Sequence, residues 1–136
     1  MKQFILMFRR QLDDVLNNYA MVCQRVELEA GFEYTLKAQV AQQCIKSFGS
    51  SIPPCDDNIN TAELSIMGVF NSGEQGIVGS SFNGYTYTFS YTGPSIDSAS
   101  LCITILQNQG IRPSFYLDGV SLTRGRAVPI PTPTDP

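Results

Sequence analysis

The 136-residue sequence contains no histidine and no tryptophan, and only 15% of its residues are charged. Without histidine, the chain has no Ser-His-Asp triad, no imidazole base and no histidine-ligated metal site. Without tryptophan, a sugar-binding surface would have to stack its ligand on tyrosine or phenylalanine rings. No run approaches the roughly 18 consecutive apolar residues that a membrane-spanning helix needs.

The charged residues are scattered along the chain. Nine Lys and Arg residues against twelve Asp and Glu residues give a net charge of −3, with no basic stripe of the kind that binds nucleic acid. We therefore expect neither a nucleic-acid partner nor a membrane partner. The high apolar content of 43%, combined with many Ser, Thr, Asn and Gln residues, is typical of one globular β domain.

The four cysteines form no CxxC motif, which argues against a zinc knuckle. An even number of cysteines in a small polar β domain favours disulfides and a secreted, extracellular location, although the apolar run near the start is shorter than a signal-peptide core. Cys44 and Cys55 flank the centre of a long polar loop over residues 43–60, and we predict a disulfide between them, with free thiols as the alternative. The pairing of Cys23 and Cys102 stays open, because they can pair only if their strands are neighbours.

The segment PSFYLDGVSL, residues 113–122, alternates in side-chain character and predicts the closing strand of the domain. In strict alternation Asp118 shares a face with Val120 and Leu122. A carboxylate on a core face needs compensation, and we expect hydrogen-bond donors or an arginine (Arg25 or Arg112) to provide it.

Five further segments show strand alternation, and Gly/Pro/Asn-rich turns join them. Together they predict an all-β fold, an antiparallel β-sandwich. The predicted core consists of the apolar faces of these strands: Leu36, Val40, Leu64, Ile66, Phe89, Leu101, Ile103, Ile105, Val120 and Leu122.

The two ends of the chain differ from this pattern. Apolar residues at helical spacing over residues 4–19 predict an N-terminal helix that packs on the domain or forms a homodimer contact; a vestigial first strand followed by a loop is the alternative. Residues 127–136 carry four of the eight prolines and predict an extended tail or linker. The predicted organisation is thus an extension over 1–19, a sandwich over 20–124 and a tail over 125–136.

Two stretches resemble CenC-type carbohydrate-binding modules, which have a galactose-binding-like jelly roll. VELEAGFEYTLKAQV is similar to their early strand–turn–strand unit, and YTFSYTGPSIDSASLCITILQNQG followed by FYLDGVSLT is similar to their last three strands. The resemblance implies a non-catalytic accessory module of a secreted protein. It also places Asp118 where the family often binds calcium. Gly119 stands in place of the family's second Asp, and the family's usual first-strand motif is missing, so we predict no cofactor, with calcium at Asp118 as the alternative.

The predicted ligand-binding residues combine aromatic rings with nearby hydrogen-bonding groups. They are Tyr85, Tyr87, Tyr91, Gln39, Glu63 and Asn83. The alternative is that the aromatic face is simply core. No catalytic residues are predicted, because nothing in the sequence brings the strand carboxylates Glu63 and Asp118 together. Two other functions stay open: a small-molecule-binding jelly roll that acts as a cyclase or pericyclic-type enzyme, and a structural or assembly domain.

Overall fold

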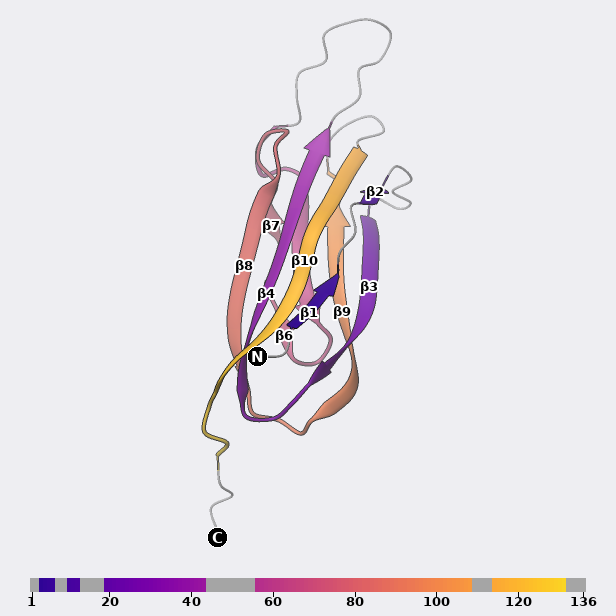
Figure 1. The fold of residues 1–136 in the computed structure, drawn as a ribbon. Coiled ribbons are helices and arrows are strands. Elements are labelled where there is room, and N and C mark those ends of the chain that lie inside the picture. The colour runs from indigo at the N-terminus through magenta and orange to yellow at the C-terminus, as the bar shows by residue number, and fades with distance from the viewer. Residues whose placement is uncertain (1–2, 7–9, 13–18, 44–55, 109–113, 132–136) are drawn as a thin grey trace, which may run out of the picture.

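The computed structural model describes residues 3–6, 10–12, 19–43, 56–108 and 114–131, and the regular structure in these ranges is all β-strand (Figure 1). The loop between β7 and β8 lies at one end of the molecule, and the chain leaves β10 at the other. The strands are β1 (Gln3–Leu6), β2 (Arg10–Leu12), β3 (Tyr19–Leu28), β4 (Phe32–Gln43), β5 (Thr61–Ile66), β6 (Phe70–Asn71), β7 (Gln75–Gly76), β8 (Asn83–Tyr91), β9 (Ile96–Leu106) and β10 (Ser114–Ala127).

The strands form two five-stranded antiparallel sheets. Sheet A has the order β1-β10-β4-β8, with β2 also pairing with β10. Sheet B has the order β3-β9-β5-β6, with β7 also pairing with β5. The predicted antiparallel β-sandwich is therefore confirmed.

The core lies between the sheets and follows the alternation seen in the sequence. Nine of the ten predicted core residues are at most 2% exposed, and Phe89 is half-buried and packs against them. Each aliphatic side chain buried in this way contributes roughly 1.5–3 kcal/mol relative to exposure. The hydrophobic faces thus account for most of the attraction between the two sheets.

The predicted N-terminal helix is wrong for the residues that the structure describes there. Residues 3–6 form β1 and residues 10–12 form β2, and both pair with β10. The backbone groups along that edge of β10 need partners, and this need overrides the helical spacing of a short apolar segment. A first strand is thus present, as the alternative interpretation held. Residues 13–18 lie outside the described ranges, and no helix within those ranges is long and apolar enough to cross a bilayer.

The closing strand changes phase in its middle. Between Asp118 and Ser121 the register with β4 shifts, because Gly119 has a φ of +59° and forms a β-bulge. Leu117 before the bulge and Val120 after it are therefore both fully buried. Asp118 pairs with exposed Gln39 on the outer face of sheet A. The prediction that Asp118 shares the core face with Val120 and Leu122 is wrong.

A disulfide joins Cys23 of β3 to Cys102 of β9. The two residues lie directly opposite each other in the antiparallel ladder of these neighbouring strands. The sequence left this pairing open because it requires the two strands to be neighbours, and in the structure they are. The predicted Cys44–Cys55 disulfide lies outside the described residues.

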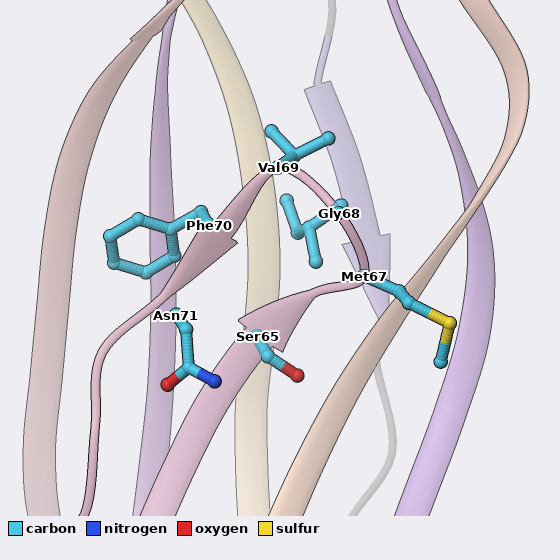
Figure 2. A pocket seen from close by; sticks show the side chains of 7 residues that line it. Ser65, Met67, Gly68, Val69, Phe70 and Asn71 are labelled. Carbon is cyan, nitrogen blue, oxygen red and sulfur yellow. The ribbon is translucent and has the colours of Figure 1, made fainter.

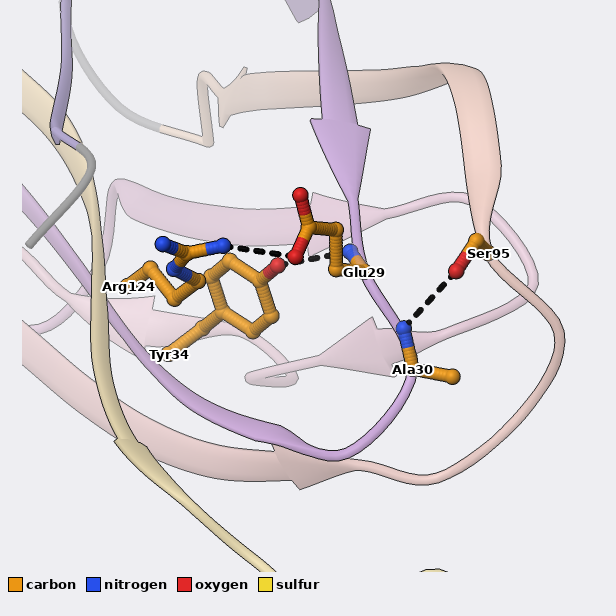
Figure 3. Close-up of polar contacts among 5 residues, drawn as sticks. All are labelled: Glu29, Ala30, Tyr34, Ser95 and Arg124. Carbon is orange, nitrogen blue, oxygen red and sulfur yellow. Dashed lines mark hydrogen bonds and ion pairs between the residues drawn. The ribbon is translucent and has the colours of Figure 1, made fainter.

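The end of the sandwich opposite the β7–β8 loop is tied together by polar contacts (Figure 3). Arg124 of β10 lies over the Phe32 ring, 4.4 Å from its centroid, and its Nη1 donates to Glu29 Oε2 at 2.6 Å. The Glu29 N–H donates to the hydroxyl of buried Tyr34 at 2.7 Å. Beyond β10, the Val128 N–H donates to the Gly31 carbonyl at 2.8 Å. The chain is thereby held against the 29–31 turn before the proline-rich residues; positions 132–136 of the predicted tail are outside the described ranges.

Candidate functional site

The aromatic residues of β8 face the interior of the sandwich. Tyr85 lies opposite buried Ala38 in the sheet, and its side chain is 9% exposed. Its hydroxyl donates to the Gly76 carbonyl at 3.0 Å. Burial, followed by the nearby Tyr87, raises the pKa of Tyr85 to about 12. Tyr85 is therefore part of the core, and its ring is not presented to a ligand.

The next aromatic rings of β8 close one side of the sandwich. Phe70 of β6 stacks on Phe89, with ring centroids 5.0 Å apart and planes 8° apart, and lies 5.6 Å from Tyr87. Phe89 in turn stacks on buried Tyr34 at 6.0 Å. Tyr87 and Tyr91 are half-buried members of this aromatic layer. The aromatic residues of β8 are thus arranged as core residues, which was the alternative to ligand binding.

Asn83 organises the loop before β8. Its side-chain amide donates to the carbonyls of Val40, Val78 and Ser81 at 3.0–3.3 Å, and its Oδ1 accepts from the Val78 N–H at 3.2 Å. Every polar atom of the side chain is therefore engaged with backbone. This geometry gives Asn83 a structural role at the loop end of sheet A.

A second polar group at the same end went unnoticed in the sequence. Gln42 is 1% exposed, and its Nε2 donates to the carbonyls of Ile77 and Gly79, both at 3.1 Å. Its Oε1 accepts from the Nδ2 of Asn60, which is fully buried. The Oδ1 of Asn60 accepts from the Asn108 N–H at 2.7 Å. The signal available in the sequence was Gln42 itself, a polar residue in phase with the buried positions of β4.

Glu63 lies on the outer face of sheet B, whereas the β8 aromatic residues lie on the inner face of sheet A. Its Oε1 accepts from Asn71 Nδ2 at 3.0 Å, across the β5–β6 hairpin. An open hollow of about 500 Å³ lies at the tip of the hairpin (Figure 2). The figure shows Phe70 and Met67 pointing in opposite directions there, and Met67 is 72% exposed. The hollow is therefore open to solvent and does not enclose a ligand.

Gln39 lies at the centre of a row of residues that crosses the outer face of sheet A. Asp118 of β10 is its partner on one side, and Gly84 of β8 is its partner on the other. A Cβ atom on Gly84 would have no heavy atom within 4 Å, and a Cβ on Gly119 would meet only the Gln39 side chain at 3.9 Å. The Gly84 side of the exposed Gln39 is thus free of side-chain bulk, and the half-buried Asp118 carboxylate lies on the other side.

Apart from Ala41, which is 4% exposed, the residues around this row are mostly polar, and several carry hydroxyl groups. Tyr116 precedes Asp118 by one outward-facing position on β10, and its hydroxyl donates to Gln43 Oε1 at 3.3 Å. On the other side of the row the hydroxyls of Thr35 and Thr88 lie 3.1 Å apart. We call this surface the Gln39 face; it consists of the outward-facing residues Thr35, Lys37, Gln39, Gln43, Gly84, Thr86, Thr88, Tyr116, Asp118 and Ser121.

Asp118 makes a local hydrogen bond at the bulge. Its Oδ1 accepts from the Gly119 N–H at 2.9 Å. A backbone donor of this kind is one of the partners expected for this carboxylate. Within the ranges that the structure describes, no three carboxylate or cysteine side chains come together in a way that could hold a metal ion. The prediction that no cofactor is bound stays a prediction.

The predicted ligand-binding residues thus occupy four places. Gln39 lies on the outer face of sheet A, Glu63 on that of sheet B, Asn83 in the loop network, and the three tyrosines on the inner face of β8. The structure places Asp118 beside Gln39, with Tyr116 one outward-facing position further along β10. Sequence alternation had placed these two residues in phase with the core, because it did not include the bulge.

Comparison with known proteins gives similarity to solved structures and no family. Neither a protein-family model nor a curated protein matches the sequence. Among solved structures, the chain is similar to a protein described as "CBM4 structure and function", with a TM-score of 0.46 and 14% sequence identity. The match covers 90% of this chain and 86% of that chain.

Proposed function

We propose that this chain is a non-catalytic carbohydrate-binding domain of a secreted protein, with a jelly-roll fold of the CenC type, and that the Gln39 face binds the glycan. The observation that carries the proposal is the row Asp118, Gln39 and Gly84, in which an exposed amide and a carboxylate lie beside bare backbone. Such groups can form paired hydrogen bonds with neighbouring sugar hydroxyls.

Two features support this assignment. Tyr116 places an aromatic ring beside the row, and rings of this kind provide the apolar contact that sugar faces require. The motifs around residues 26–40 and 115–123 that resemble CenC-type modules form β3, β4 and β10. Two of the strands that form the Gln39 face, β4 and β10, thus carry the resemblance.

A secreted location is supported by the disulfide between Cys23 and Cys102. Disulfides form and persist in oxidising compartments and are rare in the reducing cytosol. The alternative of a small-molecule enzyme calls for an enclosed apolar pocket, and the hollow at the β5–β6 hairpin has a mixed lining of polar and apolar side chains and is open to solvent. The geometry therefore favours the glycan-binding role.

The experiment is a binding screen of the purified chain against soluble and insoluble polysaccharides, followed by titration calorimetry with the best ligand. Gln39→Ala should weaken binding about fivefold, the effect of losing roughly 1 kcal/mol of hydrogen bonding. The matched control is Gln24→Ala, which removes an exposed glutamine from β3 of sheet B. Absence of binding to any polysaccharide, or equal weakening by the two variants, would contradict the proposal.

A further inference from the structure

The edge of sheet A formed by β8 differs from the other edges whose side chains the structure describes. In sheet B, β6 and β7 are two-residue strands, and β3 carries the exposed charged residues Arg25 and Glu27. Short strands and charged side chains are devices that stop a sheet edge from pairing with another chain. β8 has nine residues, Asn83–Tyr91, and includes no charged residue and no proline.

Within the described part of the chain, β8 pairs with β4 on one side and with no strand on the other. Its outward face carries exposed Thr86, Thr88 and Ser90. Its inward face carries Tyr87, Phe89 and Tyr91, which are only half-buried although they are aromatic. A long strand of this composition presents a row of backbone donors and acceptors with no charge to oppose pairing.

We propose that β8 is an interaction edge that pairs with β8 of a second copy of this chain, antiparallel about a two-fold axis. The self-complementarity of the strand argues for this occupant. In such a pair both copies turn the outer face of sheet A to the same side. The hydroxyl residues of one β8 then lie opposite hydroxyl residues of the other, and aromatic residues lie opposite aromatic residues. No like charges meet, since the strand has none.

The aromatic layer gives the pairing an apolar component. Phe70 stacks on Phe89 and lies against Tyr87 at the rim of the sandwich, so these half-buried rings already form one packed surface. Bringing the same surface of a second copy alongside removes their remaining exposed area from water. The result is one continuous antiparallel sheet across both copies, in which the two Gln39 faces point the same way. The inference does not depend on the glycan-binding proposal.

The test compares two lysine substitutions that add the same charge a few ångströms apart. Thr88 lies on the edge strand, and Thr35 lies opposite it on the interior strand β4, with the two hydroxyls 3.1 Å apart. Thr88→Lys and Thr35→Lys therefore both lose this contact, but only Thr88→Lys places the charge on the edge. Sedimentation velocity of the intact chain over a wide concentration range measures the monomer–dimer equilibrium. Circular dichroism confirms that each variant is folded.

The expected result is a dimer for the natural chain and for Thr35→Lys, with dimerisation at least about tenfold weaker for Thr88→Lys because like charges meet across the axis. Hydrogen exchange on the natural chain provides a readout that needs no variant: the amides of β8 should exchange more slowly at high protein concentration than at low. A monomer at all concentrations, equal weakening by both substitutions, or concentration-independent exchange of β8 would overturn the proposal. A monomer that pairs with an unrelated extended peptide would also overturn it.

Discussion

Replacing Gly119 by alanine should destabilise the protein through backbone conformation alone. The φ of +59° lies in the left-handed region, which costs a residue with a Cβ atom about 1–2 kcal/mol. A steric clash does not contribute, because the added Cβ would meet only the Gln39 side chain at 3.9 Å, an ordinary contact distance. Alanine also lowers the entropy of the unfolded chain, which returns about 0.4–1 kcal/mol. We therefore expect a net loss of about 1 kcal/mol in the free energy of unfolding.

The control for this prediction is Gly84→Ala on the same face of sheet A. An added Cβ on Gly84 has no heavy atom within 4 Å, and its φ is outside the left-handed region, so this variant should be neutral or stabilised by about 0.5 kcal/mol. Gly119→Asn should fall between the two alanine variants, since asparagine tolerates the left-handed region better. Urea unfolding monitored by tyrosine fluorescence measures all three. If Gly119→Ala is as stable as Gly84→Ala, the bulge does not require a glycine and the reasoning about the phase of β10 fails.

Three other predictions concern the disulfide, a buried tyrosine and the buried amide network. Replacing Cys23 and Cys102 together by serine should lower stability by about 4–5 kcal/mol in the chain-entropy model for a cross-link over 79 residues, as measured by urea unfolding; an unchanged midpoint would show that the bond contributes nothing. Because burial raises the pKa of Tyr85 to about 12, the unfolded chain ionises first, so stability should hold up to about pH 10 and fall by about 2–3 kcal/mol as the pH rises to 12. Tyr85→Phe should lose less stability over this pH range, as measured by thermal melts. An equal loss in the variant and the natural chain would contradict this prediction. Gln42→Leu should lose at least about 2 kcal/mol, because the carbonyls of Ile77 and Gly79 and the side-chain amide of Asn60 each lose a hydrogen bond that leucine cannot replace; a change within measurement error in chemical denaturation would argue against the network.

The sandwich could be predicted from the sequence because alternation is a local property. Strands such as β5 keep one phase along their length, so Leu64 and Ile66 are placed on the core face without knowledge of the neighbours. Strand β10 breaks this rule at one glycine. Before the bulge the buried residues Phe115 and Leu117 occupy odd positions, and after it the buried residue Val120 occupies an even position. The Asp-Gly pair between them was the available signal in the sequence.

The N-terminal segment and the candidate site needed information that lies elsewhere in the chain. A short apolar run fits both helical and strand periodicity, and only the unpaired edge of β10 decides that residues 3–6 form a strand. The site depends on strand register for the same reason. Gln39 and Glu63 have similar positions in their own strands, but they lie in different sheets and face opposite sides of the molecule. Alternation alone does not show which strands share a sheet.

The position of β10 in sheet A has a consequence for biosynthesis. It is the last strand of the described chain, yet it lies between β1 and β4 and makes the ladder contacts that hold both of them in the sheet. While the ribosome has exposed only the segments up to β9, sheet A lacks its central member. The nascent chain therefore carries the edges of β1 and β4 unpaired, and its final collapse waits until residues 114–127 have left the exit tunnel. Because these pairings join residues far apart in the sequence, they form slowly, and the unpaired edges of β1 and β4 are prone to aggregate until β10 is in place.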